Sequence, residues 1–248
     1  MSNSVGSFFY ATEELDQVRR MDPLLADAFT KLVQSSHSGA LSPLVREFVF
    51  LAAASVCSGI DADGIRRHSR AALLLGATLE ELRGVIELVS VQGIHTLLVG
   101  MPIVLEEAKS AGLPLPSSDT PAAQLAKEDF VTRRGYWAPI WDAVVAFSPD
   151  FLTSYVEFSA IPGEHGVLEP KVREFIYIVI NSVTTHLFPD GLRVHIRNAF
   201  AQGARPEEIV EVFQIISTIG IRSALAGLPI IEKELDASQN RNSAVKKM

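Results

Sequence analysis

Apolar residues recur at helical spacing through most of the chain, most clearly in its second half. The stretch PKVREFIYIVINSVT (170–184) is apolar nearly all round, and its length and the charged pair near its start favour a buried helix over a strand. PDGLRVHIRNAFAQG (189–203) and ARPEEIVEVFQIIST (204–218) each carry proline near the start, which suits the first turn of a helix. IRSALAGLPIIEKEL (221–235) predicts a last helix that is kinked or restarted at Pro229. These patterns predict an all-α protein.

The same order of elements occurs twice. At an offset of 127 residues, the segment 41–107 (copy 1) aligns with 168–234 (copy 2) without a gap and is identical at 27 of 67 positions. The likeness is plain in LSPLVREFVFLA (41–52) and LEPKVREFIYIV (168–179). Because this period is too long for a solenoid repeat, it predicts two tandem copies of one small helical domain.

The predicted domain bounds follow from composition. We expect a first domain over 1–112, a linker over 113–123, a second domain over 124–238 and a tail over 239–248. The linker LPLPSSDTPAA is rich in proline and serine. The tail QNRNSAVKKM is polar, and we expect it to fray.

Composition narrows the possible partners. Apolar residues make up 48% and charged residues 21% of the chain, which is ordinary for a globular protein. The net charge of -7 argues against nucleic acid as a partner. No apolar run reaches the roughly 18 residues of a membrane span, and the start of the chain does not resemble a signal peptide, so we expect a cytoplasmic protein with no membrane partner. The single cysteine, Cys57, excludes an internal disulfide and a Cys-x-x-Cys pair.

Apolar surface also predicts assembly. Segments such as 44–57 and 85–99 are apolar around nearly the whole helix, which is more than one small domain can cover. We therefore expect the two copies to pack in a two-fold-like manner within the chain. Further chains would cover the remaining surface, giving a homo-oligomer in which a trimer is favoured.

Each copy places a glutamate 21 residues before a histidine, as Glu47 and His68 in copy 1 and as Glu174 and His195 in copy 2. Two neighbouring antiparallel helices would bring each pair together. A carboxylate against an imidazole fixes the tautomer and raises the basicity, as a general acid or base requires. The alternative is that the Arg-Glu pairs are structural ion pairs and the histidines are core residues.

The two copies differ at two histidines. Copy 2 has His186 where copy 1 has Gly59, and copy 1 has His95 where copy 2 has Arg222. His186 joins the copy-2 glutamate and histidine as the predicted catalytic set, and His95 could reach across the interface into the same pocket. The set could also ligate a metal, but its spacing is no dedicated zinc signature, and we predict no metal.

The order VREF…H…A…GA..EE…G…P in both halves resembles the carboxymuconolactone decarboxylase family, within the alkylhydroperoxidase D-like superfamily. The resemblance covers residues 22–110 and 133–236, and RRGYW (133–137) resembles the Arg-Arg stretch that opens the decarboxylase domain. It implies an all-helical fold, trimeric or hexameric assembly of single domains and, in the decarboxylase branch, chemistry without a cofactor. RRGYWAPIWD (133–142) holds both tryptophans and is interpreted as a packing anchor, with a substrate platform as the alternative.

In the peroxidase branch of that superfamily the site is a Glu, a Cys-x-x-Cys pair and a His. Glu174 and His195 match the Glu and the His, while His186 and Gly191 stand at the cysteine positions. Copy 1 has glycine at both cysteine positions. The resemblance therefore gives little support to a thiol peroxidase.

The favoured hypothesis is a decarboxylase-like enzyme acting on a small carboxylated lactone or an acid from aromatic ring cleavage. Arg173, Arg193 or Arg222 would hold a substrate carboxylate, because arginine suits bidentate recognition of that group. His95, His68 and Glu47 complete the predicted substrate-binding set. The alternative is a non-catalytic small-molecule-binding or scaffold protein.

Overall fold

The repeat of the sequence is a repeat of helices in the computed structural model, which describes residues 12–245 and contains no strand within them. Copy 1 comprises α3 (Pro43–Ser55), α4 (Ala62–Leu74), α5 (Leu79–Ser90), the 3-10 turn η2 (Val91–Gly93) and α6 (Ile94–Ser110). Copy 2 comprises α10 (Pro170–Ser182), α11 (Pro189–Ala201), α12 (Pro206–Ser217), η3 (Thr218–Ile221) and α13 (Arg222–Val245). The predicted all-α fold is confirmed.

The repeat extends upstream of the aligned segments. The helices before copy 1 are α1 (Thr12–Met21) and α2 (Pro23–Ser35), and those before copy 2 are α7 (Pro121–Arg134), α8 (Ile140–Phe147) and α9 (Pro149–Glu164). At the same offset of 127, α8 corresponds to α1 and α9 to α2. The counterpart of α7 would fall before residue 12, outside the described residues.

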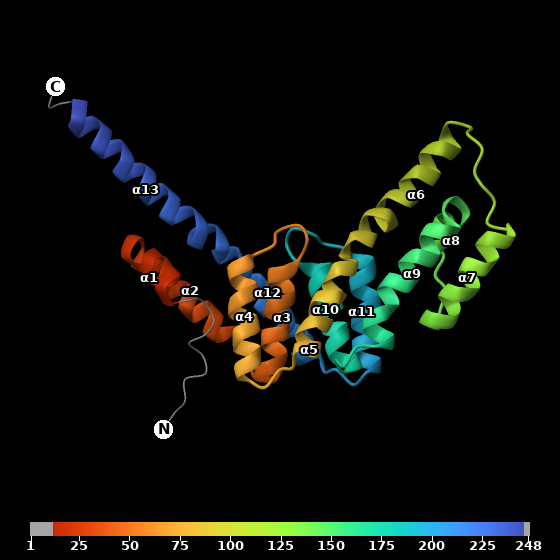
Figure 1. The fold of residues 1–248 in the computed structure, drawn as a ribbon, viewed down its shortest axis with the longest axis horizontal. Helices are drawn as coiled ribbons and strands as arrows, with labels where there is room; N and C mark the ends of the chain where they lie inside the picture. The colour runs from red at the N-terminus through yellow and green to blue at the C-terminus, as the bar shows by residue number, and fades with distance from the viewer. Residues whose placement is uncertain (1–11, 246–248) are drawn as a thin grey trace.

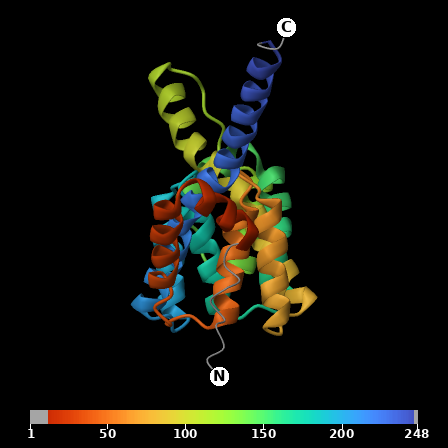
Figure 2. The same ribbon diagram turned by 90° about the vertical axis from the view of Figure 1, so that its left-hand side faces the viewer.

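The two halves exchange their last helices. The end of the first half, α6, packs against α8, while the end of the second half, α13, packs against α1. Figure 1 shows the result, with α13 leaning over α1 and α2 on one side and α6 running beside α8 and α9 on the other. The far ends of α6 and α13 rise from the helical block as two separate arms, which Figure 2 shows from the side. Each half therefore packs its last helix on the other half, and the predicted domain bounds stay a prediction.

A pseudo-two-fold axis relates the halves. Ser58 Oγ and Thr185 Oγ1, which are 127 residues apart, lie 2.7 Å from each other, as equivalent atoms do beside such an axis. Around it, α3 packs on α10, α3 on α12 and α5 on α10. One apolar core therefore spans both halves, and its fully buried side chains include Leu51, Leu88 and Ile178. The predicted two-fold-like packing within the chain is present.

Two details of the last helix differ from the sequence-based expectation. We predicted a kink or restart at Pro229, whereas α13 runs through this residue as one helix. We also predicted a frayed tail from residue 239, whereas 239–245 continue α13. Extending a helix that is already formed fixes only one residue for each added hydrogen bond, so polar residues of fair propensity can prolong it. Residues 246–248 lie outside the described part.

Two continuous helical stretches are long and apolar enough to cross a membrane by length and composition alone. They are Leu79–Ser110 and Pro206–Gln239, and each joins a core helix to one of the arms. The expectation of no apolar run of this length was therefore wrong, because the 3-10 turns join two apolar helices end to end. The first part of each stretch is buried in the protein core, with Val85 and Val212 fully enclosed.

Candidate functional site

The glutamate and histidine of copy 2 are in contact. His195 Nδ1 lies 2.8 Å from Glu174 Oε2, which confirms the contact predicted from the spacing of 21 residues. Glu174 lies on the first turn and a half of α10, which begins at Pro170, and His195 lies on α11, which packs antiparallel to it. With Nδ1–H donated to the carboxylate, Nε2 is the nitrogen left for a substrate. The pair remains accessible, since 22% of the His195 side chain is exposed.

The Tyr177 ring stacks on His195, with 4.5 Å between ring centroids. Tyr177 precedes the end of α10 and faces the same side of the helix as Glu174, three residues earlier. The His195 imidazole is therefore held on two sides, by the hydrogen bond to Glu174 at its edge and by the Tyr177 ring on its face. Such support holds a proton-transfer group in one orientation.

A pair of histidines lies beside the glutamate–histidine pair. His95 Nδ1 lies 2.7 Å from His186 Nε2, and the two rings are nearly parallel, at 5°. His186 belongs to the loop between α10 and α11, whereas His95 is the second residue of α6 and comes from the first half. The exchange of last helices thus brings His95 to copy 2, as the sequence suggested it could. Phe188 packs against His95 at 4.7 Å and closes the apolar side of this pair.

His95 is held neutral at physiological pH. Burial, together with the charges of His186 and His195, lowers its pKa to about 4. The charge of His195 reaches His95, so the glutamate–histidine pair and the histidine–histidine pair lie near each other. In its neutral form His95 can accept or donate a hydrogen bond to His186 without adding positive charge.

The equivalent pair of copy 1 is closed. His68 Nδ1 lies 2.9 Å from Glu47 Oε2, and Phe50 stacks on the His68 ring at 4.8 Å. Only 4% of the His68 side chain is exposed, compared with 22% for His195. Burial lowers the pKa of His68, although the hydrogen bond and charge of Glu47 oppose this shift. Copy 1 therefore has the same glutamate–histidine contact, but its histidine is nearly inaccessible to solvent.

Copy 1 also receives a residue from the other half, but this residue is a cation. Arg222, at the position equivalent to His95, forms an ion pair of 3.0 Å with Asp61. Its positive charge also lowers the pKa of His68, although burial and the charge of Arg67 are larger causes of that shift. Asp61 also caps α4 by accepting the Gly64 N–H. Arg222 therefore forms its ion pair beside the copy-1 site and not beside the copy-2 site.

The arginines of the predicted substrate-binding set do not gather around the Glu174–His195 contact. Arg222 lies with copy 1, Arg193 is exposed on α11, and Arg173 donates to the Gly163 carbonyl at 3.3 Å. The alternative that the Arg-Glu residues form structural ion pairs applies to Arg46 alone, and within the described residues no ion pair joins the Arg and Glu of either dipeptide. Arg46 instead lies 3.8 Å from Glu211 of α12, and Glu47 binds His68.

One cation near the copy-2 pair was not singled out from the sequence. Arg134, the last residue of α7, donates a hydrogen bond to Ser159 of α9. The RRGYW stretch gave a signal for it, but we interpreted that stretch as a packing anchor. The tryptophans do act as an anchor, since Trp137 and Trp141 pack on Phe130 in a second apolar cluster.

Two further predictions concern metal and thiol chemistry. Within residues 12–245, no group of three or more His, Cys, Asp or Glu side chains is arranged to hold a metal ion. The Cys57 thiol is exposed and donates to Gln92 Oε1 at 3.2 Å, and the chain has no other cysteine to pair with it.

Comparison with known proteins places the chain in a family. The model of the family described as carboxymuconolactone decarboxylase matches residues 149–233, which include Glu174, His186 and His195. A crystal structure from Burkholderia xenovorans LB400, of a protein provisionally identified as a gamma-carboxymuconolactone decarboxylase subunit, is 41% identical in sequence. It superposes with a TM-score of 0.84 over 92% of each chain. The chain belongs to the carboxymuconolactone decarboxylase family. No curated protein matches it.

Membership confirms the resemblance read from the VREF…H pattern. Because the superposition covers 92% of both chains, the solved carboxymuconolactone decarboxylase-like structure also has the full two-copy length. The match of the family model is confined to the second half, where the open glutamate–histidine pair lies.

Proposed function

We propose that the copy-2 site catalyses decarboxylation of a small carboxylated lactone or a related ring-cleavage acid without a cofactor. The observation that carries this proposal is the accessible contact between Glu174 and His195 beside the His95–His186 pair. The family and the identification of the Burkholderia structure support the same reaction class.

The proposed reaction breaks the carbon–carbon bond to a carboxylate. Carbon dioxide leaves, and the electron pair of that bond stays on the substrate carbon, delocalised into an adjacent carbonyl as an enolate. The His195 imidazolium then transfers its Nε2 proton to the carbon, and Glu174 stabilises the imidazolium through Nδ1–H. A water molecule or His186 restores the proton on His195. The net change is uptake of one proton and release of one carbon dioxide.

Copy 1 supplies a matched control for this assignment. The variants His195→Gln and His68→Gln remove equivalent imidazoles that each bind a glutamate, one in an open pair and one in a closed pair. A positioned proton donor contributes about 10²–10⁴-fold in rate. We expect His195→Gln to lower kcat by about that factor, whereas His68→Gln should act mainly on stability.

The assay is carbon dioxide release from a panel of carboxylated lactones and ring-cleavage acids, starting with gamma-carboxymuconolactone. Thermal melts of each variant establish that it is folded. A folded His68→Gln variant without activity, beside an active His195→Gln variant, would assign the reaction to copy 1 instead. Binding of panel members with no carbon dioxide release from any of them would favour the non-catalytic binding protein.

A further inference from the structure

Arg134 is a half-buried cation whose hydrogen-bond partner is a neutral side chain. Its guanidinium donates to the Ser159 hydroxyl, and within the described part of the chain no carboxylate forms an ion pair with it. The adjacent Arg133 is different, since it pairs with Asp129 at 3.1 Å and Glu164 at 3.2 Å. A guanidinium withdrawn from water without a counter-ion is costly, and an anionic ligand would offset that cost.

Three tyrosines surround Arg134. Burial raises the pKa of Tyr136, Tyr155 and Tyr177, to about 12 for Tyr155, and in each case the charge of Arg134 is the largest opposing influence. These hydroxyls therefore remain protonated at neutral pH. Together with the guanidinium they offer several hydrogen-bond donors in one place, as a carboxylate requires.

This cluster borders the proposed catalytic pair. Tyr177 stacks on His195, and Arg134 lies close enough to the Tyr177 hydroxyl to lower its pKa by a hydrogen bond as well as by charge. Tyr177 thus links Arg134 to the reacting imidazole. The charge of Glu174 also reaches both Tyr136 and Tyr177.

The cluster belongs to copy 2 alone. At the offset of 127, the first half has Ala28 for Tyr155, Phe50 for Tyr177 and Leu32 for Ser159. None of these three residues can donate a hydrogen bond from its side chain. The polar cluster is therefore no general feature of the helical fold, and it accompanies the open site.

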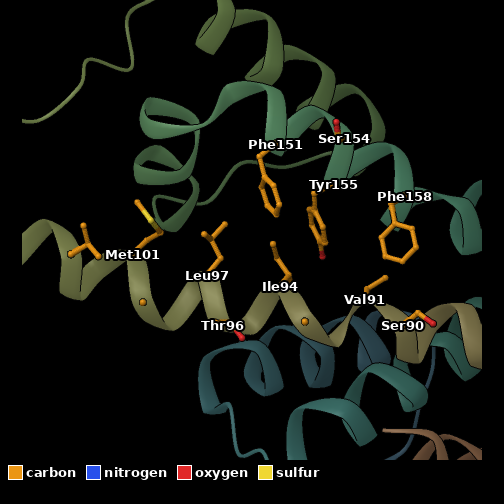
Figure 3. A pocket seen from close by; sticks show the side chains of 13 residues that line it. Ser90, Val91, Ile94, Thr96, Leu97, Met101, Phe151, Ser154, Tyr155 and Phe158 are labelled. Carbon is orange, nitrogen blue, oxygen red and sulfur yellow. The ribbon is translucent and has the colours of Figure 1, made fainter. Parts of the chain in front are cut away.

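Tyr155 also faces an open groove. This groove, of about 680 Å³, runs between α6 and α9 and is lined mostly by apolar side chains. Figure 3 shows Tyr155 between Phe151 and Phe158 on one wall, opposite Ile94 and Leu97. The apolar body of a small acid could therefore approach the cluster along the groove.

We propose that Arg134, assisted by the hydroxyls of Tyr155 and Tyr177, binds a carboxylate of the substrate that is retained in the product. This inference rests on the proposed decarboxylation. A cation on the departing carboxylate would stabilise the ground state more than the transition state, because negative charge leaves that group as carbon dioxide forms. Arg134 therefore suits a second carboxylate of the substrate. Arg134 is a positioning residue that selects acids with a second anionic group.

Binding of an unreactive charge series tests the subsite without turnover. The probes are adipate, monomethyl adipate and dimethyl adipate, which have similar shape but two, one and no charges. Both tryptophans lie nearby, with Trp141 stacked on Tyr155 at 6.0 Å, so intrinsic fluorescence reports occupation of the site. We expect the wild-type protein to bind adipate most tightly and the dimethyl ester most weakly.

The decisive comparison is Arg134→Gln against Arg133→Gln, two neighbouring arginines on one helix. We expect Arg134→Gln to weaken adipate binding at least about tenfold, Arg134→Lys to recover part of the loss, and Arg133→Gln to change it less than about twofold. Tyr177→Phe should weaken adipate binding a fewfold, and its fold should be tolerated, because Phe50 stacks on His68 in the same way in copy 1. The dimethyl ester should bind all variants equally.

Equal adipate binding by Arg134→Gln and the wild type would overturn the proposal, as would an equal loss in Arg133→Gln. Failure of the wild type to bind adipate at about 10 mM would also count against it, since a good charged contact should be detectable there. The proposed function is tested separately. If no decarboxylation is found but adipate binding depends on Arg134, the proposed reaction is refuted and the subsite is not. If the enzyme is active and Arg134→Gln leaves its KM unchanged, the subsite alone is refuted.

Discussion

The neutral His95 predicts a specific loss of stability in acid. Its pKa is about 4 in the folded protein against 6.5 for an unperturbed histidine, because it is buried and faces His186 and His195. Between these values the unfolded chain binds the proton more readily than the folded chain does, so the free energy of unfolding falls as the pH falls. Each tenfold difference in proton affinity is worth about 1.4 kcal/mol, which gives about 3 kcal/mol over the whole window and about 2 kcal/mol between pH 7 and pH 5.

The comparison that isolates this contribution is wild type against His95→Asn. Asparagine can still donate a hydrogen bond to His186 but does not titrate. Urea unfolding at pH 7 and pH 5 should show the wild type losing about 2 kcal/mol more than the variant over this interval. His165→Asn is the control, because 76% of that side chain is exposed, and it should behave as the wild type does. Equal acid losses in the wild type and His95→Asn would refute the assignment of a neutral, buried His95.

Three further outcomes are expected. Glu211→Ala should lower the free energy of unfolding by about 3 kcal/mol in urea titrations, because the fully buried carboxylate accepts hydrogen bonds from the hydroxyl of Ser38 and from two backbone N–H groups of residues 40–41. Gly203→Ala should cost about 1 kcal/mol by the same assay, since this residue has φ of 80°, where a Cβ is unfavourable. Light scattering should give a mass of about 81 kDa for a trimer of 27.0 kDa chains, whereas a 27 kDa species at micromolar concentration would contradict the predicted assembly.

The sequence was sufficient for features that depend on local spacing. Apolar periodicity and N-terminal prolines located α10, α11 and α12 to within a few residues, because these signals act within one helix. The spacing of 21 residues between Glu174 and His195 predicted their contact, since one helix, a short loop and an antiparallel return bring such positions together. The role of each residue in catalysis stays a prediction.

The sequence was insufficient for features that depend on which half packs where. An offset of 127 is the same whether α6 packs within its own half or across the axis, so the exchange of last helices could not be deduced from it. The Arg134 cluster was missed because its members come from α7, the loop after it, α9 and α10. In addition, the first half has no hydrogen-bonding side chain at the positions of Tyr155, Ser159 and Tyr177. Comparing the two copies draws attention to residues that are present in both, whereas the residues of this cluster are present in only one.

The exchange of α6 and α13 has a consequence for how such a protein can evolve. In a symmetric dimer of identical chains, every substitution falls on both sites at once, so a change that harms one site also harms the other. Here the two sites are encoded separately, and each borrows a residue from the opposite half, His95 in one case and Arg222 in the other. A single substitution can therefore alter one site and leave its twin intact. Joining the copies therefore lets the two sites diverge while the helices of each half still complete the site of the other.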